Sequence, residues 1–119
     1  MKERTIEVLL KAGLPMNVKG FDYIVQAMEL FDDGWKNTKI TALYMKIGKD
    51  NNVNASQVER NLRYAFKTIL DKGVKEYVFK YFDVNNKTNS AQLSCLYYRL
   101  SEARKKERMD ENNNKKYFA

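Results

Sequence analysis

The stretch that most constrains this chain runs from Asn54 to Gly73, because it predicts one long helix with two faces of opposite character. Asn54 and Gln57 form an asparagine variant of the reciprocal capping pattern at its start, and Gly73 tolerates a left-handed helix end. One face is apolar at the 3.6-residue period of a helix: Val58, Leu62, Ala65, Phe66, Ile69 and Leu70. We expect this face to be buried in a core.

The opposite face of this helix, about residues 55–72, is polar and rich in cations. Its candidate DNA-binding residues are Ser56, Gln57, Glu59, Arg60, Arg63, Tyr64 and Lys67. An arginine fork matches the two acceptors of guanine, a carboxylate accepts from the amino group of cytosine, and a helix fits the major groove. A solvated face with scattered charges is the alternative, and the pattern alone leaves both interpretations open.

The length and composition of the chain limit the number of domains, the kind of partner and the cell compartment. A chain of 119 residues suits one domain with a single core, and its net charge of +7 favours a polyanionic partner such as nucleic acid. The single cysteine excludes an internal disulfide and fits a reducing compartment. No apolar run approaches the ~20 residues of a membrane span, and the N-terminus lacks a signal-peptide core. We therefore expect a cytoplasmic protein without membrane contact.

Apolar periodicity predicts five further helices, which makes the fold class all-α with six helices. Their expected ranges are Glu3–Ala12, Lys19–Asp32, Thr38–Lys49, Val74–Phe82 and Asn89–Arg108. We expect residues 1–108 to form one helical effector domain, and residues 109–119 to be a flexible, polar, basic tail.

Short polar segments set the expected helix ends. Asn37 or Thr38 is the expected cap of the third helix, and Asn89 with Gln92 repeats the capping arrangement of the fourth. The connection between the third and fourth helices is only about residues 50–53, so the two must cross steeply. That arrangement is typical of a helix-turn-helix, in which the second helix enters the groove. Any helical hairpin with a tight turn has the same spacing.

Catalytic signals are few. The chain has no histidine, which excludes histidine-based triads, histidine metal sites and imidazole bases. It has no glycine-rich phosphate loop, and we interpret Asp32-Asp33 as a turn, not a metal site. We expect no enzyme activity, cofactor or metal, although a catalyst built on lysine, tyrosine or a carboxylate pair is compatible with the sequence.

Residues from Ile6 to Glu102 together resemble the C-terminal DNA-binding effector domain of the stage-zero sporulation response regulator family. The matching segments are Gly13-Leu14-Pro15, Val18-Lys19-Gly20-Phe21, Tyr23, Ala27, Leu43-Tyr44, Ala55-Ser56, Val58-Glu59-Arg60, Lys72-Gly73 and Thr88-Asn89-Ser90. The resemblance implies a six-helix domain whose third and fourth helices form the helix-turn-helix. It also implies binding to a TGTCGAA-like box, often in tandem copies that could seat a homodimer, and transcription control through RNA polymerase.

The resemblance assigns roles to individual residues. It implies that Glu59 and Arg60 contact base edges, while Ser56 and Arg63 hold phosphates. The family has arginine at the position of Gln57, histidine at that of Tyr64 and proline at that of Lys87. The first two departures lie on the groove-facing side, so the preferred box is open to alteration.

A second function stays open beside DNA binding. The family's receiver domain has no counterpart in these 119 residues, so we expect an excised domain or a stand-alone relative. The alternative is a protein-interaction module or antagonist that pairs with a full-length regulator through the aromatic fifth helix or the sixth.

Overall fold

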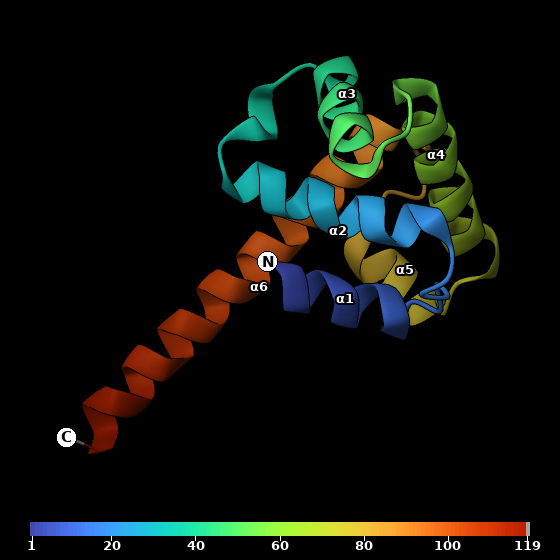
Figure 1. Ribbon diagram of the computed structural model, residues 1–119. Coiled ribbons are helices and arrows are strands. Elements are labelled where there is room, and N and C mark those ends of the chain that lie inside the picture. The colour runs from blue at the N-terminus through green and yellow to red at the C-terminus, as the bar shows by residue number, and fades with distance from the viewer. Residues whose placement is uncertain (119) are drawn as a thin grey trace.

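A computed structural model describes residues 1–118, and side chains through residue 112. This part of the chain contains six α-helices, one 3-10 turn and no strand, which confirms the predicted all-α fold (Figure 1). The elements are α1 (Lys2–Lys11), α2 (Lys19–Asp32), the 3-10 turn Trp35–Asn37, α3 (Ile40–Asn51), α4 (Ala55–Lys72), α5 (Lys75–Tyr81) and α6 (Asn89–Phe118). No helix within residues 1–118 combines the length and apolar character needed to cross a bilayer.

The α2 helix lies at the centre of the core and contacts α1, α3, α4 and α6. Its apolar side chains are buried as predicted, and so is the α4 stripe, where only Leu70 stays partly exposed at the edge. The largest fully buried side chains come from most of the helices: Leu9, Leu14, Phe21, Ile24, Met28, Leu43, Ile47, Leu62, Phe66, Ile69, Leu93 and Leu96. Burial of apolar surface, which contributes about 25 cal/mol per Å², is the main force that holds α4 in place.

Gly20 lets α2 and α4 approach closely. A Cβ atom at this position would lie 2.3 Å from the carbonyl oxygen of Asn61 and 2.6 Å from the Cβ of Ala65. Any side chain would therefore push the two helices apart. This contact fixes which side of α4 faces inward and leaves its polar side outward.

Two predicted helix ends were wrong. The structure starts α3 at Ile40 after Lys39, and no side chain caps it, because Asn37 belongs to the 3-10 turn. Gly73 has φ −70° and ψ 164°, which is extended rather than left-handed. Glycine is needed there for space, since a Cβ would lie 2.3 Å from the carbonyl oxygen of Ile69.

The start of α6 also differs from the prediction. Thr88 caps it, because its Oγ1 accepts the backbone N–H of Ala91 at 3.2 Å. Asn89 is already inside the helix and is buried. The side chain of Gln92 holds the preceding loop instead, with hydrogen bonds to Asp83 and Asn86. Both amides are used for tertiary contacts, which local sequence patterns do not reveal.

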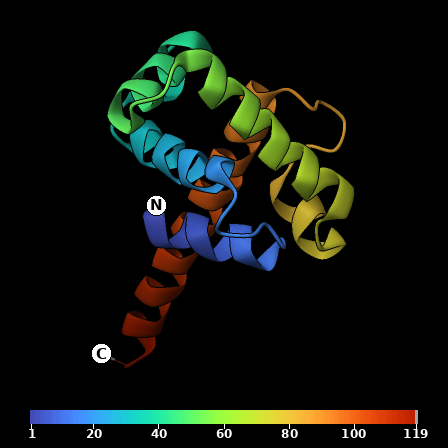
Figure 2. The same ribbon diagram turned by 45° about the vertical axis from the view of Figure 1, so that its right-hand side comes forward.

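The α6 helix is longer than expected. Its backbone continues through Phe118, past the point near Arg108 where the apolar register fades. The second half extends away from the other helices, on the side opposite α4 (Figures 1 and 2). Ion pairs of Arg104 with Asp32 and of Arg4 with Glu107 tie its middle to α2 and α1. A boundary at residue 108 and a flexible tail over 109–119 stay predictions.

Candidate nucleic-acid interface

A tight turn joins α3 to α4. Asn52 ends α3 in the left-handed conformation with φ 58°, which asparagine tolerates better than most residues. The turn then folds back over Gly48, where a Cβ would lie 2.6 Å from the carbonyl oxygen of Val53. Asn51 anchors the end of α3 to α2 through a 2.6 Å hydrogen bond to Gln26. The predicted helix-turn-helix pair is therefore braced from behind.

The predicted reciprocal cap opens α4. Asn54 Oδ1 accepts the N–H of Gln57 at 2.8 Å, and Gln57 Oε1 accepts the N–H of Asn54 at 2.9 Å. Such a cap satisfies two helix-end donors that would otherwise lack partners. The cap also occupies the Oε1 atom of Gln57. Only the amide NH₂ group of this candidate residue therefore remains free to donate to a ligand.

The candidate residues form one continuous outer face of α4. Six of the seven are exposed and Glu59 is half-buried: Ser56, Gln57, Glu59, Arg60, Arg63, Tyr64 and Lys67. The ring of Tyr64 is 62% exposed, which is high for a large aromatic side chain on a folded domain. The helix thus separates a buried apolar face from a cationic outer face, as its sequence predicted.

Two side chains on this face form an ion pair. Arg63 Nη1 lies 2.8 Å from Glu59 Oε1, one helical turn away. Because both side chains are partly exposed, this pair contributes only about 0.3–0.5 kcal/mol to stability. Arg60 is different, since its only side-chain bond within the described residues is a weak 3.5 Å contact from Nε to the carbonyl oxygen of Ser56. The fork of Arg60 is therefore free to bind a ligand, whereas the carboxylate of Glu59 is held in place.

Sequence reasoning missed two residues behind Glu59. Asn89 Nδ2 donates to the carbonyl oxygen of Glu59 at 3.1 Å and to the hydroxyl of Tyr44 at 3.0 Å. This amide joins α3, α4 and α6 at the middle of the outer face. Burial raises the pKa of Tyr44, which keeps its hydroxyl protonated. The signal in the sequence was the adjacent Thr88, a good cap that leaves Asn89 free for another role.

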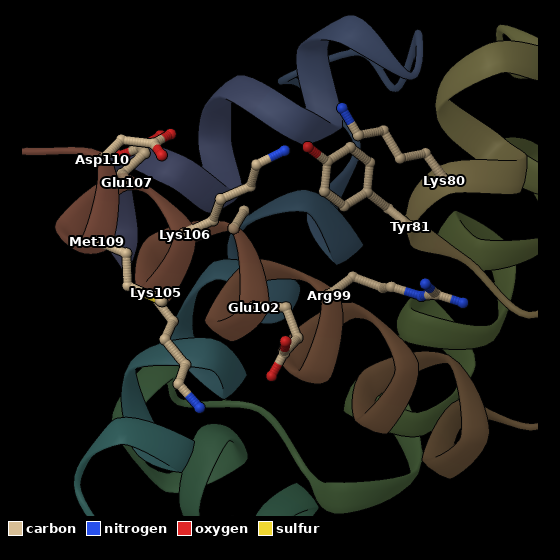
Figure 3. Close-up of a pocket in the computed structure, with 10 residues that line it drawn as sticks. Lys80, Tyr81, Arg99, Glu102, Lys105, Lys106, Glu107, Met109 and Asp110 are labelled. Carbon is tan, nitrogen blue, oxygen red and sulfur yellow. The ribbon is translucent and has the colours of Figure 1, made fainter. Parts of the chain in front are cut away.

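A larger hollow lies away from this face and has no catalytic arrangement. It has a volume of about 690 Å³ and runs between the end of α5 and α6. Figure 3 shows Lys80 and Tyr81 facing charged side chains of α6 across an open groove. These charges have mixed sign and do not converge on one point. Among the described residues, no group of three or more acidic or cysteine side chains is placed to hold a metal.

The chain also matches a known protein family. Residues 5–100 match the family described as "Sporulation initiation factor Spo0A C terminal". That family is a helical DNA-binding regulatory domain and not an enzyme family. The match covers most of the 119 residues, including the whole of α2 to α5 and Asn89, whose amide joins α3, α4 and α6. The chain therefore belongs to the family of C-terminal DNA-binding domains of sporulation initiation factor Spo0A.

Proposed function

We propose that this protein is a sequence-specific transcription regulator that places α4 in the major groove of DNA. The observation that carries this proposal is the division of α4 into a buried stripe and an exposed face with three cations, Arg60, Arg63 and Lys67. A merely solvated face would not require that the turn between α3 and α4 be held against α2, or that the carboxylate of Glu59 be ordered by Arg63. Both features favour a binding role.

The proposed base contacts follow from hydrogen-bonding geometry. The free guanidinium of Arg60 forks onto the O6 and N7 atoms of guanine, and the Glu59 carboxylate accepts from the N4 amino group of cytosine. Adjacent guanine and cytosine contacts agree with the TGTCGAA-like box that the resemblance implies. Ser56, Arg63 and Lys67 position the helix on phosphates. Gln57 and Tyr64 are the places where the preferred box can differ.

The wider role is a further part of the proposal. Tandem boxes would seat two copies side by side as a homodimer on DNA, and the exposed surface around α5 would then face RNA polymerase. We place this activity in the cytoplasm of the cell.

Selection of bound duplexes from a random pool tests the proposal directly. We expect one enriched box, and binding to it that is about 10³-fold or more tighter than to a scrambled duplex. Arg60→Ala should cost about 1–3 kcal/mol on that box and relax the preference at one base pair. Arg108→Ala is the matched control, because Arg108 is an exposed arginine in the second half of α6, which extends away from α4 (Figure 1).

Two results would contradict the proposal. One is a pool that enriches no sequence. The other is an equal loss of affinity in Arg60→Ala and Arg108→Ala, which would reduce Arg60 to a general positive charge. If gel shifts stay negative while the protein captures a full-length regulator, the interaction module becomes the better description.

A further inference from the structure

A second hollow lies beside the outer face of α4 and is lined by residues from three helices. Its volume is about 500 Å³, many times the roughly 30 Å³ share of one water molecule. The lining residues are Ile40 and Tyr44 of α3, Glu59 and Arg63 of α4, and Lys87, Thr88, Asn89 and Ser90 at the start of α6. None of the α3 or α6 residues was a candidate from the sequence.

The first turn of α6 forms one side of this hollow. Thr88 accepts the N–H groups of Ala91 and Gln92 through its side chain and its carbonyl oxygen. The N–H groups of Asn89 and Ser90 have no acceptor among the described residues. A long helix such as α6 also places partial positive charge at this end. The hollow therefore has donors for an anion on its α6 side.

Side chains add both charge and an unsatisfied polar group. Lys87 is exposed at the rim and forms no ion pair within the described residues, while Arg63 neutralises the nearby carboxylate of Glu59. Asn89 is only 7% exposed, and its Oδ1 atom has no hydrogen-bond partner among the described residues. An amide oxygen only accepts hydrogen bonds, so a donor such as a water molecule would have to lie between it and a phosphate oxygen. Ordered waters that bridge to phosphates are common in protein–DNA interfaces.

The hydroxyl of Tyr44 supplies a directed donor. It accepts a hydrogen bond from Asn89 Nδ2 at 3.0 Å, so its own proton is available to a third group. Tyr44 lines the hollow, where an anionic oxygen would be a suitable acceptor. Together the hollow offers two backbone N–H groups, one hydroxyl and one free ammonium group.

We propose that this hollow binds a backbone phosphate of the DNA, next to the base pairs that α4 reads. The proposal rests on the proposed function, because it takes the α4 face as the surface that meets the duplex. In B-DNA the phosphates border the major groove, so a helix in the groove has them at its flanks. The start of α6 then fixes the depth and register of α4, while Arg60 and Glu59 supply sequence preference.

Two variants test the site through different physical quantities. Lys87→Gln removes one phosphate contact, so it should weaken binding about threefold to tenfold on every sequence. It should also lower the slope of log affinity against log salt by about 0.9. Tyr44→Phe removes a neutral donor, so it should weaken binding by a similar factor and leave the slope unchanged. Lys105→Gln is the matched control, because Lys105 is an exposed lysine of α6 that lines the other hollow, between α5 and α6.

A phosphate scan of the selected duplex then locates the contact. Replacing single phosphates by uncharged methylphosphonates should weaken wild-type binding at one flanking position, and the two variants should be insensitive at that position. Thermal melting of Tyr44→Phe confirms that the variant is folded at the assay temperature. Binding in added inorganic phosphate, compared with chloride at equal ionic strength, distinguishes a DNA phosphate from a free anion.

The outcomes separate this site from the proposed function. If wild type prefers its box but Lys87→Gln and Lys105→Gln behave alike, the phosphate site is wrong and base reading by α4 stands. Strong competition by inorganic phosphate beyond that of chloride would assign the hollow to a free anion. If wild type shows no preference for any duplex, the proposed function and this site are both wrong.

Discussion

The close contact at Gly20 gives the sharpest test of how α4 is held. In Gly20→Ala the new Cβ would lie 2.3 Å from the carbonyl oxygen of Asn61. This oxygen is a backbone atom of the packed helix α4, so it cannot move aside by a change of rotamer. Overpacking costs about 1–3 kcal/mol, and overlap with both a backbone oxygen and the Cβ of Ala65 puts this case at about 2–3 kcal/mol. Alanine recovers up to about 1 kcal/mol of helix propensity. We therefore expect a net loss of about 1–2 kcal/mol.

Thermal unfolding followed by circular dichroism measures this loss. At roughly 4 °C per kcal/mol for a domain of this size, Gly20→Ala should lower Tm by about 4–8 °C. Gly34→Ala is the control for a strained glycine, because Gly34 has φ 102° but no atom within 4 Å of an added Cβ. That control should lose about 1 kcal/mol through backbone strain alone. A Gly20→Ala variant as stable as wild type would refute the close packing of α2 on α4.

Two other changes test the cap and the contact between α2 and α6. Asn54→Ala should destabilise the fold by about 1 kcal/mol in urea unfolding, while Asn54→Asp should keep most of the cap. Burial acts to raise the pKa of Asp32, but hydrogen bonds from Tyr97 and Arg104 and the nearby positive charges outweigh it, so the pKa is lowered. A lowered pKa in the folded state gives stability above the unfolded value, and this stability is lost as pH falls. Urea unfolding from pH 7 down to below about pH 4 should therefore show a smaller decline in Asp32→Asn than in wild type.

The sequence was sufficient to predict the features that depend on local periodicity. The bounds of α2 and α4, the buried stripe, the reciprocal cap of Asn54 and the short turn before it all follow from residues close together in the chain. The polar face of α4 could be predicted for the same reason. The family resemblance agreed with these predictions and added the expected roles of Glu59 and Arg60.

The features that escaped prediction depend on contacts between distant residues. Asn89 has the sequence context of a cap, yet its amide binds Tyr44 and the carbonyl oxygen of Glu59, which are 45 and 30 residues away. Gly73 resembles a left-handed helix end, but a Cβ atom there would lie only 3.0 Å from the carbonyl oxygen of Ala12, at the end of α1. Asparagine and glycine each suit several local roles, and only tertiary packing decides which role is used.

Gln57 is the residue where the stability of the fold and the proposed choice of DNA sequence depend on one side chain. The side chains of the other outer residues of α4 form no capping hydrogen bond, so under the proposed function the preferred box can vary while the fold stays constant. Gln57 instead holds the N–H of Asn54 at 2.9 Å. Gln57→Arg, which introduces the residue that the family has here, removes that bond and adds a cation to the outer face of α4.

Gln57→Arg should therefore lower the stability of the fold and increase the electrostatic part of DNA binding, and each effect has its own assay. Loss of one reciprocal bond should lower the free energy of unfolding by about 0.5–1 kcal/mol, because Asn54 still caps through its own side chain. One added phosphate contact should steepen the salt dependence of DNA binding by about 0.9. Gln57→Ala separates the effects, since it loses the bond without adding charge. If Gln57→Arg is as stable as wild type and binds with the same salt slope, the side chain contributes to neither, and the reciprocal cap has no energetic weight in this helix.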